Sequence, residues 1–261
     1  PGWRCRTTAK EFAVWLGWLV GVAVVVFAWI PISDKTIWFF VQDAGTQAAD
    51  IGSRMIPPKF SYMEKLWWPI WDTISIATLG TAIALVIAFP IAFAAARNTT
   101  PHPIVRAAAL FIIVASRSVN SLIWALMLVF IFGPGVLAGT IAIGLRSVGF
   151  CAKLLYEAIE EIDLKAVEAV EATGASGAQT MLYAIVPQVL PTFAGVGVFR
   201  WDINIRESTI LGLVGAGGIG LQLNGSINTL AWTQVSMILL VILVTVIISE
   251  WVSAKVRHAI I

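Results

Sequence analysis

Six long apolar blocks constrain this chain more than any other feature, because each is long enough to cross a lipid bilayer as a helix. They lie at about residues 12–30, 72–96, 107–132, 136–156, 189–214 and 232–252. Of the 261 residues, 59% are hydrophobic and only 12% are charged, whereas a soluble domain carries about 25% charged residues. We therefore expect an all-α, polytopic membrane protein with six transmembrane helices in one domain, residues 1–261.

Basic residues predict the orientation, because Lys and Arg gather in the short cytoplasmic loops. If the six helices alternate, one side of the membrane carries both chain ends and the loop at about 157–188, with Arg4, Arg6, Lys10, Arg97, Arg106, Lys153, Lys165, Lys255 and Arg257. The short loops on the other side, at about 132–135 and 225–231, carry no charge. We therefore expect both termini and the 157–188 loop to lie in the cytoplasm of a bacterial cell.

We draw further expectations from the start of the chain and from its first connection. The chain begins at Pro1 and not at Met, so we expect the native N-terminus to lie upstream. The first apolar block lacks a small-residue cleavage site, and we interpret it as a spanning helix and not as a signal peptide. The external segment 31–69 is rich in Trp and Phe, which favours an interfacial helix on the outer leaflet. Its alternative role is a contact surface for an external binding protein.

The loop at about 157–188 has its own pattern. Residues 157–172 mix Glu, Ala, Lys and Leu, which favours a helix, and Gly174 then predicts a helix stop. Pro187 and Pro191 mark the start of the fifth membrane helix. The sequence therefore predicts a short helix across the membrane face, a turn, and a return into the membrane.

This loop resembles the "EAA" loop of bacterial ABC-importer permeases, whose pattern is Glu-Ala-Ala, three residues, Gly, nine residues and Ile-x-Leu-Pro. Glu168, Ala169, Gly174 and Pro187 fall on matching positions, while Val170, Ala184 and Val186 depart from it. The resemblance implies a type I (MetI-like) permease fold with a cytoplasmic coupling helix. It also implies that the loop meets a partner ATPase, at residues Glu168, Ala169, Glu171, Ala172, Gly174 and Pro187.

A second motif, Gly215 to Gly220, matches G-x-G-x-x-G literally. A dinucleotide site needs that loop between a strand and a helix with an acidic residue about 20 positions on, and the next acidic residue here is Glu250. Close helix packing or irregular backbone beside a cavity fits better. The run from Arg206 to Gly220 is similar to the phosphonate-import branch of the permease family, which implies phosphonate, phosphate or phosphite as substrate.

Charges within the apolar blocks need partners, because a lone Arg at mid-membrane costs about 2.5–3.5 kcal/mol. The fifth apolar block is interrupted by two charged groups, at residues 200–202 and 206–207. Within these groups, Arg206 can pair with Glu207 and Arg200 with Asp202. Arg117 and Arg146 have no acidic residue nearby in sequence. One hypothesis is an anion path, since the planar fork of Arg suits phosphate-like groups; the alternatives are inter-helix ion pairs or snorkelling to a headgroup. The candidate path residues are Arg117, Asn120, Ser121, Arg146, Arg200, Arg206 and Glu207.

Catalytic chemistry has no support in this sequence. It contains no Ser/His/Asp set, no P-loop Lys and no metal-ligand spacing, and its net charge of +2 without a basic run gives no sign of nucleic-acid binding. By resemblance, the chain holds no cofactor, and ATP and Mg are bound by the partner ATPase. The implied partners are ABC ATPase subunits, a second permease copy, an external substrate-binding protein and the lipid bilayer.

Three alternatives remain at this point. One is an importer permease for another small solute such as methionine. The second is a secondary transporter or channel, which predicts an ionisable relay or inverted repeats that the sequence lacks. A membrane-embedded enzyme is the third, and it lacks candidate catalytic residues.

Overall fold

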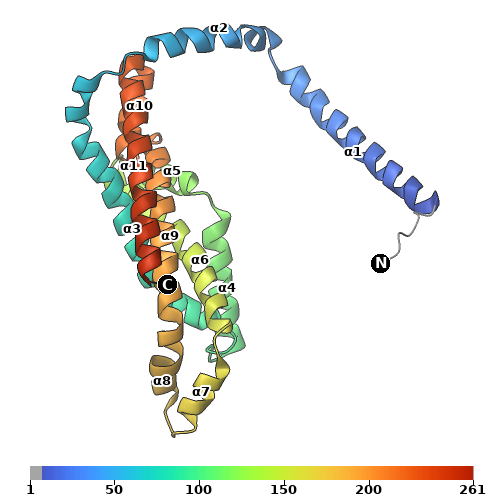
Figure 1. Cartoon of the computed structure of the whole chain (residues 1–261), viewed down its shortest axis with the longest axis vertical. Helices are drawn as coiled ribbons and strands as arrows, with labels where there is room; N and C mark the ends of the chain where they lie inside the picture. The colour runs from blue at the N-terminus through green and yellow to red at the C-terminus, as the bar shows by residue number, and fades with distance from the viewer. Residues whose placement is uncertain (1–7, 261) are drawn as a thin grey trace. The chain divides into compact units, whose positions relative to one another are not determined.

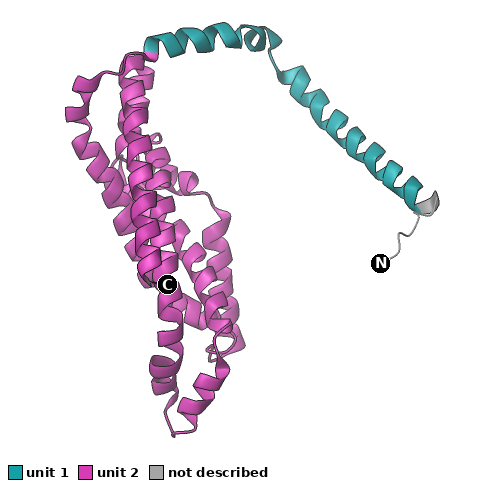
Figure 2. Ribbon diagram, viewed as in Figure 1, with its two compact units in different colours: residues 1–54 teal, residues 55–261 magenta. Residues whose placement is uncertain are grey.

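The computed structural model describes residues 8–260 of the chain and the side chains of residues 10–259, and the regular structure of this part is entirely helical (Figure 1). Two compact units follow one another, residues 1–54 and residues 55–261 (Figure 2). In chain order the elements are α1 (Thr8–Lys35), α2 (Trp38–Met55), η1 (Phe60–Lys65), α3 (Trp67–Ala95), α4 (Pro103–Ser118), α5 (Ser121–Phe132), α6 (Val136–Glu160), α7 (Leu164–Glu171), α8 (Gly177–Thr180), η2 (Met181–Ile185), α9 (Val186–Gly212), α10 (Ile219–Asn228) and α11 (Trp232–Ile260).

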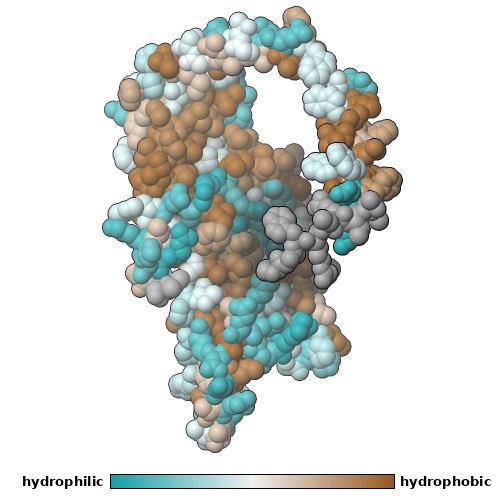
Figure 3. Space-filling view, turned by 45° about the vertical axis from the view of Figure 1, so that its right-hand side comes forward, coloured by the Kyte–Doolittle hydropathy of each residue, from teal (hydrophilic) through white to brown (hydrophobic). Residues whose placement is uncertain are grey.

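Five of these helical stretches are long and apolar enough to cross a membrane, and a bent pair brings the number to six if it counts as one span. The five are Lys10–Lys35, Trp67–Ala95, Val136–Glu160, Gly177–Gly212 and Trp232–Ala259. Apolar side chains cover much of the surface, while hydrophilic side chains are frequent at the lower tip, the end at which Figure 1 draws α7 and α8 (Figure 3). The predicted all-α polytopic fold class is confirmed.

The prediction of one continuous third span at 107–132 is wrong. The chain turns by 86° between α4 and α5. Val119 adopts an extended backbone there, and the side chain of Asn120 caps α5 by accepting a hydrogen bond from the N–H of Leu122 at 3.0 Å. An Asn at this position satisfies the free N–H groups of a new helix, so a second helix begins where hydropathy alone predicts one unbroken segment.

The fifth span also differs from its prediction, because it begins earlier and is not interrupted. One helical stretch runs from Gly177 to Gly212, with a five-residue π-helical segment, η2, between α8 and α9. Pro187 is the second residue of α9, which directly follows η2, and as a proline it has no N–H to donate at the junction of the two segments. Pro191 lies inside the helix. The polar groups at 200–202 and 206–207 stay helical because their side chains find partners, as described below.

Small residues allow α3 and α6 to pack closely along their length. On α3 the buried small residues recur every three or four positions, at Ala77, Gly80, Ala84, Ala88, Ala92 and Ala95. A Cβ added at Gly80 would lie 2.8 Å from Cγ2 of Ile143 on α6, closer than real contacts allow. This small-residue spacing is how membrane helices approach each other tightly, and both α3 and α6 also contact α9.

Two connections differ from simple loops. The expected loop at 225–231 is preceded by a helix that the sequence did not predict, α10, which occupies Ile219–Asn228. In the external segment 31–69, α2 confirms a helix, with no residue buried within the structure. Its position on the outer leaflet stays a prediction.

Candidate functional site

The segment that resembles a coupling loop forms α7 and the turn after it, at one end of the second unit (Figure 1). The predicted short helix is present as α7, but it begins later than residue 157. The reason is that α6 continues to Glu160 and Asp163 starts the new helix by accepting a hydrogen bond from the N–H of Lys165 at 2.9 Å. Gly174 ends the turn with a φ of 82°, a conformation that glycine adopts without strain, and its N–H donates to the carbonyl of Glu171 at 2.9 Å. The predicted coupling residues of this tip are all exposed: Glu168, Ala169, Glu171, Ala172 and Gly174.

The base of α7 is held on α9 by one side chain that the sequence analysis missed, Gln188. Its Oε1 accepts a hydrogen bond from the N–H of Asp163 at 3.0 Å, while its Nε2 donates to the carbonyl of Ala184 at 2.8 Å and lies 3.4 Å from the carbonyl of Asp163. Ile162 and Val167 pack against the adjacent buried cluster. Pro187, the sixth predicted coupling residue, is exposed directly beside Gln188. The signal for Gln188 is a long polar side chain directly before the predicted apolar span 189–214.

A buried polar cluster lies between α3, α6 and α9. Arg200 is only 3% exposed, and its Nε donates to Oγ of Ser147 at 2.9 Å. Asn204, fully buried, shares that hydroxyl and donates to Oγ1 of Thr81 at 2.7 Å. The guanidinium of Arg200 also lies 5.0 Å from the ring centre of Phe150. Arg200 is thus bonded to Ser147 of α6, and through Ser147 and Asn204 it belongs to a hydrogen-bond network that reaches Thr81 of α3.

The charged residues pair differently from the local pairs considered in the sequence analysis. Glu207 of α9 accepts hydrogen bonds from Arg146 of α6 and from Arg200, whose Nη2 lies 3.4 Å from each carboxylate oxygen. Arg206 pairs with Asp202 one helical turn earlier, and Oδ1 of Asp202 also accepts a hydrogen bond from Ser249 of α11 at 2.8 Å. The inter-helix ion pair considered as an alternative for Arg146 is therefore present.

The other candidate path residues are not joined to this cluster by any hydrogen bond or ion pair among the described residues. Asn120 caps α5, and Ser121 beside it is buried. Arg117 is exposed at the end of α4, and its side chain passes α6 at Gly149, where an added Cβ would lie 2.9 Å from Cγ of Arg117. The structure therefore brings Arg146, Arg200 and Glu207 together and leaves Arg117, Asn120 and Ser121 at the α4–α5 bend.

The glycine-rich run packs the C-terminal end of α9 against its neighbours. Gly215, Gly217 and Gly218 all have positive φ, and a Cβ added at Gly217 would lie 3.1 Å from the backbone nitrogen of Val136. The hydroxyl of Thr73 accepts a hydrogen bond from the N–H of Ile219 at 2.9 Å. The run thus forms a close-packed turn between two helices, as expected, and no strand adjoins it among the described residues.

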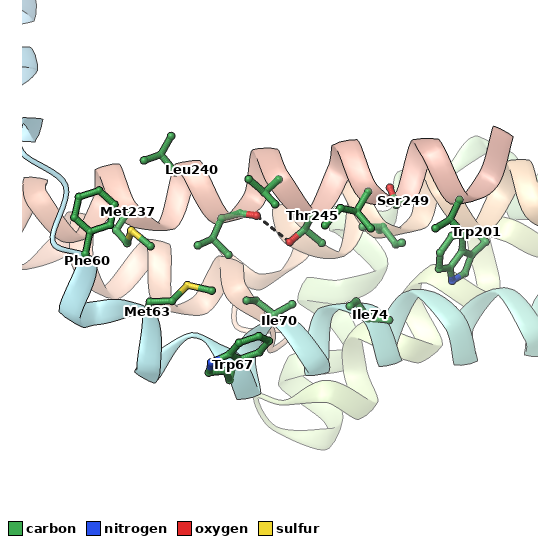
Figure 4. A pocket seen from close by; sticks show the side chains of 15 residues that line it. Phe60, Met63, Trp67, Ile70, Ile74, Trp201, Met237, Leu240, Thr245 and Ser249 are labelled. Atoms are coloured by element: carbon green, nitrogen blue, oxygen red, sulfur yellow. Dashed lines mark hydrogen bonds between the residues drawn. The ribbon is translucent and has the colours of Figure 1, made fainter. Parts of the chain in front are cut away.

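A groove of about 630 Å³ opens between η1, α3, α9 and α11 and is lined almost entirely by apolar side chains, including Phe60, Met63, Trp67, Met237 and Leu240 (Figure 4). Its two hydroxyl side chains are already engaged: Thr245 donates to the carbonyl of Val241 at 2.8 Å, and Ser249 donates to Asp202. The groove therefore suits apolar chains and offers no charged group to an anion. No group of three or more His, Cys, Asp or Glu side chains within residues 10–259 is placed to hold a metal ion.

Residues 88–258 match the family described as "Binding-protein-dependent transport system inner membrane component". The match runs from the last part of α3 to near the end of α11 and includes the tip of α7 and the residues Arg146, Arg200 and Glu207. The chain belongs to this family of multi-pass membrane permeases. At the level of individual proteins, it is 41% identical over 251 residues to the phosphite transport system permease protein PtxC of Stutzerimonas stutzeri, covering 93% of this chain and 90% of that protein.

Two further comparisons agree with this assignment. The chain is 39% identical over 242 residues to the phosphate-import permease protein PhnE of Mycolicibacterium smegmatis, covering 92% of this chain and 45% of that longer protein. Among solved structures, an inward-facing form of the MetNI methionine ABC transporter matches with a TM-score of 0.66 at 20% identity, over 78% of this chain and 99% of that one. An identity of 20% shows a shared fold alone, and that fold is the expected MetI-like permease fold.

Proposed function

We propose that this chain is the permease subunit of an ATP-driven importer that carries phosphite, phosphonate or phosphate across the cytoplasmic membrane. The observation that carries the proposal is the 41% identity, over 93% of the chain, to a phosphite transport system permease. The names of the relatives mention phosphite, phosphate and phosphonate, which are all tetrahedral oxyanions of phosphorus. Arg146 and Arg200 supply hydrogen-bond donors of the type that recognises such groups.

In this proposal two permease copies assemble with two ATPase subunits and an external binding protein, and both termini lie in the cytoplasm. The tip of α7 contacts the ATPase through Glu168, Ala169, Glu171, Ala172 and Gly174, and Pro187 lies at the base of the same contact. Support comes from the exposure of these six residues and from the attachment of α7 to α9. The ATPase, and not this chain, binds ATP and Mg, so this chain is non-catalytic.

The proposed path for the anion runs along α6 and α9, past Arg146, Arg200 and Glu207. Arg117, Asn120 and Ser121 would lie beside this path at the α4–α5 bend, while Arg206, paired with Asp202, would lie on another face of α9. The likeness to a methionine transporter concerns the fold alone and gives no support to methionine as substrate. A secondary transporter or channel would not need the exposed α7 tip.

The test is ATPase activity and uptake by the purified assembly in lipid vesicles, with the external binding protein loaded with phosphite. We expect loaded binding protein to stimulate ATP hydrolysis and uptake. In Glu168→Lys the stimulation should fall by about tenfold or more, because charge reversal at a protein contact costs several kcal/mol. The same reversal at Glu250, an exposed carboxylate on α11, is the control and should leave the stimulation intact.

Two results would contradict the proposal. If the wild-type permease retains no ATPase on purification, the importer class is wrong. If only another solute stimulates the assembly, the permease class stands and the phosphorus oxyanion does not.

A further inference from the structure

Two guanidinium groups share a single carboxylate in the layer of the spanning helices. Arg146 from α6 and Arg200 from α9 both pair with Glu207. Within residues 10–259, neither arginine forms an ion pair with any other carboxylate. The nearby pair of Arg206 and Asp202 is balanced, so the group of Arg146, Arg200 and Glu207 carries one excess positive charge.

An excess charge at this depth calls for a compensating anion. Removing an ion from water costs several kcal/mol even after relaxation, and charged side chains inside membrane spans accordingly pair with one another or face water. Here the internal pairing is incomplete by one negative charge. The cluster therefore attracts an anion more strongly than a balanced ion pair would.

The three groups also differ in how firmly they are held. Arg200 is fixed by Ser147 and the ring of Phe150. Its contact with Glu207 is loose, because both distances are 3.4 Å, whereas charge-assisted hydrogen bonds are typically about 2.7–2.9 Å. The side chain of Arg146 is 31% exposed and that of Glu207 is 17% exposed, so the cluster opens to the surface at the Arg146–Glu207 contact. An arriving anion would meet Arg146 first and find Arg200 already oriented.

We propose that Glu207 is an exchangeable counter-ion, and that a phosphorus oxyanion binds to Arg146 and Arg200 in its place during transport. The choice of anion rests on the proposed function. In the resting protein the carboxylate of Glu207 occupies the position that the oxyanion takes, which keeps the two guanidiniums apart from bulk anions. The exchange breaks and forms no covalent bond. Anion binding is weak, because the anion must displace the carboxylate of Glu207.

This proposal predicts changes of opposite sign for two substitutions, which a purely structural ion network does not. Glu207→Gln removes the competing charge and leaves both guanidiniums available, so affinity for the anion should rise by about tenfold or more, given the strength of a unit charge in close contact. Arg146→Gln leaves Arg200 balanced by Glu207, so affinity should fall by about tenfold or more. Arg54→Gln is the matched control, because Arg54 is exposed and, within residues 10–259, pairs only with Asp50 on its own helix.

The experiment measures binding of inorganic phosphite and of inorganic phosphate by calorimetry. Binding is measured on the assembled permease and ATPase in lipid nanodiscs without binding protein. Uptake by the wild type is measured in parallel in lipid vesicles with the external binding protein. Support is tighter binding in Glu207→Gln, weaker binding in Arg146→Gln and no change in Arg54→Gln. If Arg146→Gln does not assemble, Arg146→Lys replaces it, and binding should weaken because the planar fork is lost.

Four results overturn the inference: weaker binding in Glu207→Gln, failure of that variant to assemble, unchanged affinity in that variant, or no anion binding in either the wild type or Glu207→Gln. The first two assign Glu207 a structural role. Absence of phosphorus-oxyanion uptake by the wild type overturns the proposed function instead. If the wild type takes up the anion and Glu207→Gln binds it with the wild-type affinity, the proposed function stands and only the counter-ion role is overturned.

Discussion

At the scale of single residues, glycines on α6 decide how closely its neighbours approach. A Cβ added at Gly139 would lie 2.6 Å from the carbonyl oxygen of Ala216, a backbone atom in the glycine-rich turn. One added at Gly144, a turn further along the same helix, would lie 3.6 Å from the carbonyl oxygen of Gly80, an ordinary contact. The two glycines therefore offer a matched comparison.

We expect Gly139→Ala to destabilise the folded protein by about 1–3 kcal/mol, because overpacking forces backbone to move. Gly144→Ala should be neutral or stabilising by up to about 1 kcal/mol, since Ala favours the helix. Thermal unfolding of the two variants in the same detergent measures the difference. Equal unfolding temperatures would show that the turn yields freely and that the close approach at Gly139 has little weight.

Residue pairing shows where sequence reasoning succeeds and where it stops. On a helix, residues four positions apart lie on the same face, so the pair of Arg206 with Asp202 follows from periodicity, whereas adjacent partners such as Arg206 and Glu207 point apart. The partner of Arg146 does not follow from sequence, because Glu207 comes from another helix 61 positions away. Long-range packing decides that pairing.

At the scale of elements, the link between α7 and α9 depends on Gln188. Its side chain joins both backbone groups of Asp163, the residue that caps α7. Arg200 lies 12 residues further along the same helix, about 18 Å at a rise of 1.5 Å per residue. Displacement of α7 by a partner therefore reaches the polar cluster through one continuous helix.

We expect Gln188→Leu to reduce ATPase stimulation by the loaded binding protein about fivefold or more, since two lost hydrogen bonds correspond to about 1–3 kcal/mol of coupling. Basal ATP hydrolysis should persist, because the exposed tip of α7 is unchanged. The control is Gln222→Leu, the same change on α10, where Gln222 accepts a hydrogen bond from Tyr62 at 3.3 Å. An equal effect of both variants would assign the loss to general destabilisation.

Element boundaries explain most of the errors of the sequence analysis. Hydropathy measures how apolar a segment is and carries no information on its direction, so it merged α4 and α5 across a bend of 86°. The cap at Asn120 is a local signal that was present in the sequence. For α10, the glycine run beside it favoured a loop, and tertiary packing against α9 and α11 outweighed this local preference.

At the scale of the whole molecule, the all-helical fold and the permease class followed from the sequence, because long apolar blocks and one loop motif depend little on side-chain detail. The polar cluster did not follow as a unit. The residues of this cluster come from α3, α6 and α9 and lie between Thr81 and Glu207 in the chain.

The proposed orientation makes a further prediction at this scale. The tip of α7 and α8 and the turn between α10 and α11 lie at opposite ends of the second unit (Figure 1). In a chain with Cys5 and Cys151 replaced by Ser, Ala178→Cys should react with a membrane-impermeant thiol reagent only in inverted vesicles. Thr229→Cys should react only from the external side; both positions are exposed. Labelling of both cysteines from one side, or the reverse pattern, would contradict the orientation.

The bend between α4 and α5 has a consequence for hydration. The last carbonyl groups of a helix have no donors within that helix, and an unsatisfied backbone group facing hydrocarbon costs several kcal/mol. In the last turn of α4, the carbonyl of Ala115 accepts a hydrogen bond from the hydroxyl of Ser118 at 2.9 Å. In the membrane, the surface at Val119 and Asn120 must therefore contact water or protein. Lipid acyl chains are excluded from it.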